Sequence, residues 1–108
     1  MGEKAFLALV DVIEEEKGVQ ALKLQGNNLT DKCVIALCRM LEDVHHKDLE
    51  YLDLSENPSL TDETASALAS LVTRLPNLAQ VRLQECPRVS KQKMNVLELK
   101  VDEKILNA

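Results

Sequence analysis

The chain has 108 residues, a formal net charge of −5 and a pI near 5.0, and only 2% of its residues are aromatic. This length allows one domain with a continuous core, which must be built from Leu, Val, Ile and Ala. The basic residues form no concentrated cluster of the kind that phosphate groups require. We therefore expect no nucleic-acid partner and no membrane partner.

The three cysteines, Cys33, Cys38 and Cys86, form no C-x-x-C pair and match no zinc-site spacing. We expect reduced thiols in an intracellular, cytoplasmic protein. The apolar stretch near the N-terminus is flanked by acidic residues and interrupted by Asp11, which is not the pattern of a signal peptide. No segment approaches the length of a membrane span.

The first predicted element is a helix over residues 3–17. Phe6, Leu9 and Ile13 recur at spacings of three and four residues, which gives this helix one apolar stripe. Because Ile13 lies six residues before Val19, we interpret residues 3–17 as the helical half of a repeat whose strand is absent.

Three later segments share the pattern L-x-x-L-x-L-x-x-N/C. They begin at Val19, Leu49 and Leu78, which are 30 and 29 residues apart and leave room for a helix after each strand. Strands joined by helices in this way pair in parallel. We therefore predict parallel strands over residues 19–24, 49–54 and 78–83.

A helix start is marked after each predicted strand. Thr30, Thr61 and Ser90 occupy the N-cap position, and Asp31 and Asp62 place negative charge in the first helical turn. Residues 96–101 also alternate as in a strand, so the last segment carries a second pattern. The predicted helices cover residues 31–44, 62–75 and 90–104.

The predicted core consists of apolar side chains that stacked strands point inward. Its rows are Leu22, Leu52 and Val81, and then Leu24, Leu54 and Leu83. Asn27 and Asn57 are expected to hydrogen-bond the backbone of adjacent turns. Cys86 takes the same position in the third repeat, where we expect a buried structural thiol, with a reactive thiol as the alternative.

Over nearly its whole length, the chain resembles leucine-rich repeats of the ribonuclease-inhibitor type. The resemblance implies an α/β solenoid that forms a single domain over residues 1–108, with a three-stranded parallel sheet on the concave face and helices on the convex face. It also implies a protein-interaction module, because inhibitors, immune receptors and actin-end binders of this type share the binding of proteins. The repeat pattern does not specify the partner.

No catalytic constellation is found, so we expect no enzyme activity and no cofactor. His45 and His46 are adjacent, with Asp43 and Asp48 nearby, but neighbouring histidines on a loop point in different directions. We expect a solvated loop here rather than a metal site. Neither a glycine-rich phosphate loop nor a Ser-His-Asp arrangement can be proposed.

The side chains between the core leucines are expected to form the binding surface. Lys23, Asp53 and Arg82 form one column, whose alternating charges favour mutual pairing. Tyr51 lies at the centre, either as a binding hot spot or packed over the stems of Lys23 and Gln80. We expect this surface to be free of structural roles and to consist of Tyr51, Lys23, Asp53, Arg82, Gln25, Gln84, Glu56 and Glu85.

Two other functions stay open from the sequence. The first is activation of a small GTPase, which the resemblance allows and in which Arg82 or Arg88 would act near a phosphate. The second is a structural, self-assembling piece of a longer array. In that case the unpaired edges at 19–24 and 78–83 would pair with further copies, so that self-association is expected.

Overall fold

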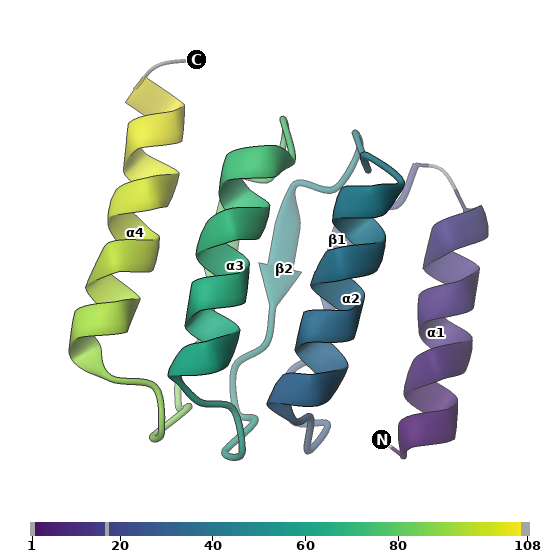
Figure 1. Cartoon of the computed structure of the whole chain (residues 1–108), viewed down its shortest axis with the longest axis horizontal. Coiled ribbons are helices and arrows are strands. Elements are labelled where there is room, and N and C mark those ends of the chain that lie inside the picture. The colour runs from purple at the N-terminus through teal and green to yellow at the C-terminus, as the bar shows by residue number, and fades with distance from the viewer. Residues whose placement is uncertain (1, 17, 107–108) are drawn as a thin grey trace.

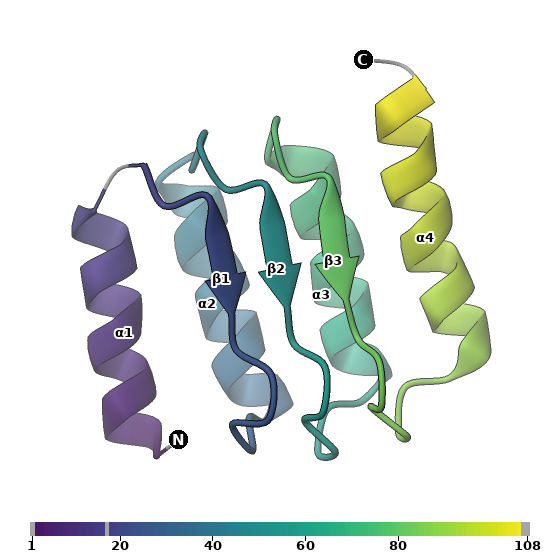
Figure 2. The same cartoon turned by 180° about the vertical axis from the view of Figure 1, so that it is seen from behind.

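The computed structural model describes residues 2–16 and 18–106, in which a layer of helices covers one face of a parallel sheet (Figures 1 and 2). The elements follow the predicted order, and the final segment is helical despite its second pattern. Lys17, the predicted end of the first helix, lies outside the described residues. The elements are α1 (Glu3–Glu15), β1 (Ala21–Lys23), α2 (Asp31–Asp43), β2 (Tyr51–Asp53), α3 (Asp62–Arg74), β3 (Gln80–Arg82) and α4 (Lys91–Leu106).

The strands pair in parallel in the order β1-β2-β3, with Leu22 opposite Leu52 and Leu52 opposite Val81. Pairing continues past the strand ends, because the Leu24 amide donates to the Asp53 carbonyl and the Leu54 amide donates to the Arg82 carbonyl. The register therefore confirms the predicted repeats. Each repeat adds one strand to the sheet and one helix to the helical layer.

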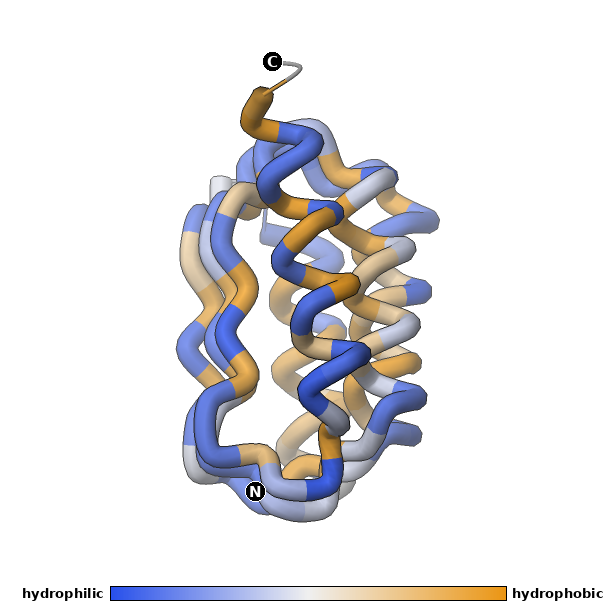
Figure 3. Tube along the Cα trace, turned by 90° about the vertical axis from the view of Figure 1, so that its left-hand side faces the viewer, coloured by the Kyte–Doolittle hydropathy of each residue, from blue (hydrophilic) through white to orange (hydrophobic). Residues whose placement is uncertain are grey.

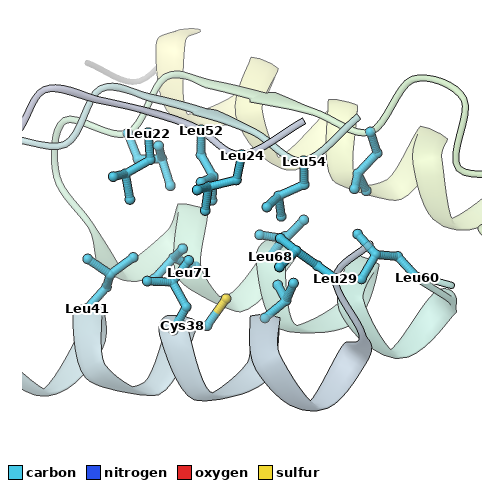
Figure 4. Close-up of a cluster of buried hydrophobic side chains, with 14 of the residues drawn as sticks. Leu22, Leu24, Leu29, Cys38, Leu41, Leu52, Leu54, Leu60, Leu68 and Leu71 are labelled. Carbon is cyan, nitrogen blue, oxygen red and sulfur yellow. The ribbon is translucent and has the colours of Figure 1, made fainter. Parts of the chain in front are cut away.

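The core lies between the sheet and the helices, as Figure 4 shows for the leucines that face one another across it. Leu52 and Leu54 of the central repeat are fully buried, whereas Leu22 is 7% exposed at the first strand. Val81, on the last strand, is only half-buried. The predicted rows are confirmed, and burial is deepest where a strand has neighbours on both sides.

The helices differ in how much apolar surface they bury. In α2, Val34, Leu37, Cys38 and Leu41 are buried, whereas in α4 only Leu97 is. Figure 3, which views the molecule from the α4 side, shows the strands and the helices as two separate layers. No helix in the described ranges is both long and apolar enough to cross a bilayer.

The predicted N-caps are confirmed. Thr30 accepts a hydrogen bond from the Cys33 amide, Thr61 accepts one from the Glu63 amide, and Ser90 accepts one from the Lys93 amide at 3.2 Å. Each bond satisfies one of the backbone donors that an α-helix leaves unpaired in its first turn. Each of these three helices therefore begins with a side-chain cap, although the turn before α2 is one residue shorter than the turns before α3 and α4.

Asn57 forms a polar clamp between the first and second repeats. Its amide nitrogen donates to the carbonyls of Leu24, Leu54 and Ser55, and its Oδ1 accepts from the amides of Asn27 and Leu29. At the same position in the third repeat, the Cys86 thiol lies 3.5 Å from the Leu54 carbonyl oxygen. Asn57 bonds to the backbone of the adjacent turn, as predicted, whereas the Asn27 side chain donates to the Gln25 carbonyl of its own turn at 3.2 Å. Cys86 is a buried structural thiol, as predicted.

A second clamp joins the helix starts. The Asp31 carboxylate accepts hydrogen bonds from the Thr61 amide at 2.9 Å and from the hydroxyls of Thr61 and Thr64, both at 2.6 Å. Asp62 repeats part of this arrangement by accepting from the Ser90 amide at 2.7 Å. The two aspartates, predicted only as first-turn charges, therefore also tie each repeat to the next one.

Candidate functional site

The open face of the sheet is the side of the three strands that faces away from the helices (Figure 2). Side chains alternate along a strand, so the residues between the core leucines belong to this face. The register aligns Tyr51 with Ala21 and Gln80, and Asp53 with Lys23 and Arg82. The predicted columns are therefore present in the structure.

Tyr51 is held in place by a chain of hydrogen bonds along the open face. Its hydroxyl donates to Asp53 Oδ2 at 3.1 Å, and Asp53 Oδ1 accepts from the Ser55 amide at 3.0 Å. Ser55 Oγ in turn accepts from the Gln84 amide at 2.9 Å, which links β2 to the segment after β3. The half-buried ring of Tyr51 is thus fixed by its hydroxyl before any partner arrives.

Asp53 departs from the expectation that the surface column is free of structural roles. Its side chain is only 9% exposed, and within residues 2–16 and 18–106 no ion pair joins it to Lys23 or Arg82. Burial by itself raises the pKa of Asp53. The hydrogen bonds from Ser55 and Tyr51, together with the charge of Arg82, outweigh burial and lower that pKa below its ordinary value. Asp53 therefore has a structural role, because it accepts hydrogen bonds from the Ser55 amide and the Tyr51 hydroxyl and so holds Tyr51 in place.

The remaining predicted residues fall into two groups. Lys23, Arg82, Gln25 and Gln84 are exposed along or just after the strands, around Tyr51. Glu56 and Glu85 are also exposed, but they lie in the turns beyond the strands. Their φ angles of 58° and 57° place them in the left-handed region, as Gly26 is at 68° in the first repeat. The structure brings the first group together around the tyrosine and leaves the two glutamates at the far end of the face.

A shallow hollow of about 490 Å³ adjoins Tyr51 at the end of the face where the strands begin. Glu50 and Gln80 contribute polar groups to it, and Ile105 of α4 contributes an apolar side chain. No histidine, cysteine or serine lines this hollow to act as a nucleophile or base. The arrangement offers a polar, partly aromatic contact surface.

The histidine pair behaves differently from the predicted solvated loop. His45 is exposed, with a φ of 50°, but His46 is buried at 7% exposure and its Nδ1 accepts a hydrogen bond from the Leu49 amide at 3.2 Å. The expectation was wrong for His46, because its ring fills the space beneath the turn into β2. Among the residues that the structure describes, no group of three or more His, Cys, Asp or Glu side chains could hold a metal ion.

The three cysteines are free thiols. Burial raises the pKa of Cys38 to about 12, and the charge of Glu42 adds to this effect. Burial also raises the pKa of Cys86, against hydrogen bonds from the backbone of Asn57 and Glu56 that lower it. Both thiols thus stay protonated at neutral pH, which disfavours a nucleophilic role.

Sequence reasoning missed two supporting residues. Ser55 was not among the predicted site residues, although its amide donates to Asp53 and its hydroxyl accepts from the Gln84 amide. Lys104 was not singled out, although its ammonium group donates to the carbonyls of Val72 in α3 and of Leu75 and Leu78 in the segment between α3 and β3. A signal for Lys104 was present, because a lysine stands where the preceding repeat has the buried Leu75.

Comparison with known proteins adds one finding. The sequence model of a family described as "Leucine Rich repeat" matches residues 19–38 and 45–69, which are the segments that carry β1 with most of α2 and β2 with most of α3. No curated protein and no solved structure matches the chain.

Proposed function

The chain is a leucine-rich-repeat protein, and from that premise we propose that it binds a partner protein through the open face of its sheet. Proteins of this class generally mediate protein–protein interaction, and repeat arrays present extended surfaces suited to it. The observation that carries the proposal is the bonded chain from Tyr51 through Asp53 to Ser55.

A fixed aromatic ring is a favourable anchor for a partner. Tyrosine buries a large area with few rotatable bonds, and it is one of the residue types enriched at binding hot spots. Because the hydroxyl of Tyr51 is already bonded to Asp53, a partner that covers the ring loses little conformational entropy in doing so. Lys23, Arg82, Gln25 and Gln84 supply the polar surround.

Other features of the chain support the finer parts of the proposal. The spacings of 30 and 29 residues, with a helix after every strand, support the ribonuclease-inhibitor type of repeat. One continuous core from Phe6 to Leu97 supports a single domain. The three free thiols support a reducing, intracellular environment.

The proposal is tested by affinity capture from the source cells with three forms of the protein. Tyr51→Ala removes the anchor, Tyr51→Phe keeps the ring but not its bond to Asp53, and Arg39→Ala is a control on the exposed side of α2. A protein retained by the parent and by Arg39→Ala but lost with Tyr51→Ala is the expected partner.

The affinity of the purified partner then completes the test. We expect Tyr51→Ala to weaken binding by about 2 kcal/mol, or roughly 30-fold, and Tyr51→Phe to weaken it less. If every captured protein binds Tyr51→Ala as tightly as the parent, the open face is not the binding surface.

A further inference from the structure

The edge groove is lined by residues of β3 and of helix α4, the helix that lies beyond the free side of β3 (Figure 2). Its larger part has a volume of about 320 Å³, and it continues into a hollow of about 230 Å³ that shares Val81, Arg82, Leu97 and Glu98. Val81 and Leu83 line the strand side, and Leu97, Glu98, Val101 and Asp102 line the helix side. We propose that the edge groove binds an extended, basic peptide segment of another protein as an additional strand beside β3.

The backbone of β3 is prepared for a further strand. The Gln80 amide donates to Glu50, and the Arg82 carbonyl accepts from Leu54, so these two residues bond to β2. In a parallel sheet, alternate residues bond to opposite neighbours. The N–H and C=O groups of Val81 and Leu83 therefore point toward the edge groove, where no described residue bonds to them.

The side chains of the edge groove indicate the chemistry of the segment. Side chains that turn toward α4 meet the aliphatic Leu97 and Val101 and then the exposed carboxylates of Glu98 and Asp102. No ion pair involves either carboxylate in the described part of the chain. A lysine or arginine fits this sequence of surfaces, with its stem on the aliphatic residues and its charge at the carboxylates. The net charge of −5 also attracts a basic segment.

A second copy of the chain fits this edge poorly. The helices outnumber the strands in the described residues, so α1 lies beyond β1 at one end and α4 lies beyond β3 at the other (Figure 2). A copy that continued the sheet from β3 through its own β1 would bring its α1 to the seam that α4 already covers. Paired strands lie about 4.8 Å apart, and this single step would have to hold both α4 and the α1 of the copy, which need about 8–10 Å between their axes. A segment without a helix avoids this conflict.

The test uses a fluorescein-labelled, end-blocked peptide of eight residues that alternates threonine with lysine. We expect it to bind the parent protein, in fluorescence anisotropy, and to shift the amide resonances of Val81 and Leu83 more than those of Ala21 and Lys23. The same peptide with N-methylated backbone amides, and a threonine–glutamate peptide, are expected not to bind. Equal binding of the N-methylated peptide, or shifts spread over all acidic surfaces, would overturn the proposal.

Protein variants make the test specific to this site. Glu98→Lys combined with Asp102→Lys should weaken binding at least tenfold, because both exposed carboxylates line the edge groove. Glu103→Lys changes the charge by half as much as the double variant, at an exposed position of α4 that does not line the edge groove, and should change affinity less than about twofold. Similar losses in the double variant and in Glu103→Lys would mean that only net charge matters.

Two further measurements separate the remaining outcomes. Tyr51→Ala, which removes the anchor of the open face, should leave peptide binding unchanged, so the two proposals fail independently. Sedimentation velocity of the unlabelled protein should show a monomer at all concentrations. A concentration-dependent dimer that the peptide does not dissociate would assign the edge to a second copy instead.

Discussion

The first and second seams, between repeats one and two and between repeats two and three, have the same backbone arrangement but different polar clamps. At the first seam Asn57 makes five hydrogen bonds, whereas at the second Cys86 makes two longer contacts through sulfur. Asp31 accepts three hydrogen bonds across the first seam, and Asp62 accepts one across the second. The leucine pattern thus determines the geometry of a repeat, and the polar positions determine how firmly it is attached.

The helices reinforce this difference. In α3 five residues are buried, whereas in α4 Leu97 alone is. Lys104 partly compensates, since its ammonium group donates to the Val72 carbonyl in the last turn of α3, where positive charge is favourable, and to the Leu78 carbonyl before β3. Burial also lowers the pKa of Lys104, so this contact involves partial desolvation of the ammonium group. We infer that the polar clamps hold the third repeat, which carries the edge groove, to the second repeat less firmly than they hold the second repeat to the first.

The largest expected effect separates the two clamps directly. Asn57→Ala should lower the free energy of unfolding by about 4 kcal/mol, because it leaves several buried backbone groups without partners. Cys86→Ala should lower it by only about 1 kcal/mol, since its contacts are long and weak. Urea unfolding monitored by circular dichroism measures both values. Equal losses would show that the two seams are clamped equally.

Core substitutions at the same position of two strands should also differ. Leu52→Ala is expected to lower the free energy of unfolding by about 3 kcal/mol, because this fully buried side chain has neighbours on both sides. Val81→Ala should lower it by about 1 kcal/mol, since Val81 is half-buried at the edge. A loss below about 1 kcal/mol for Leu52→Ala in denaturant unfolding would place Leu52 outside the core row.

The aspartate clamps give a smaller difference, together with a dependence on pH. Asp31→Ala should lower the free energy of unfolding by about 2 kcal/mol at pH 7, and Asp62→Ala by about a third of that, in proportion to the three hydrogen bonds of Asp31 and the one of Asp62.

Burial raises the pKa of Asp31, but hydrogen bonds from Thr61 and Thr64 lower it by more, to below its ordinary value of 3.8. A lowered folded-state pKa stabilises the fold above pH 3.8, and this stabilisation is lost as the pH falls through the folded-state value. The Tm measured by thermal unfolding should therefore fall less between pH 7 and pH 2.5 in Asp31→Asn than in the parent. An unchanged pH dependence would contradict the role of Asp31.

The smallest effects test whether the turns after β2 and β3 carry the same backbone strain. Glu56 and Glu85 have left-handed backbone conformations that a glycine adopts without steric cost. Glu56→Gly and Glu85→Gly should each raise the free energy of unfolding by about 0.5 kcal/mol, and Gly26→Ala should lower it by about 1 kcal/mol. Opposite signs for the two glutamates in urea unfolding would mean that their turns differ in strain.

The sequence was sufficient to predict the repeats, the parallel order and the helix caps, because each depends on local spacing and on residue type. It did not show which side chains of the surface column are buried and which are exposed. Asp53 was grouped with the exposed Lys23 and Arg82, although the Ser55 amide and the Tyr51 hydroxyl draw its carboxylate into the sheet. Burial of His46 likewise depends on a turn that folds its ring under Leu49, and this contact leaves no periodic signal in the sequence.

Native-state hydrogen exchange tests the difference between the two seams most directly. The amides of Leu24 and Leu29 donate across the first seam, and those of Leu54 and Gln84 donate across the second. If the third repeat opens first, Leu54 and Gln84 should exchange at least tenfold faster than Leu24 and Leu29, which corresponds to an opening free energy lower by about 1.4 kcal/mol. Equal protection of the four amides, or faster exchange of Leu24 and Leu29, would contradict the account.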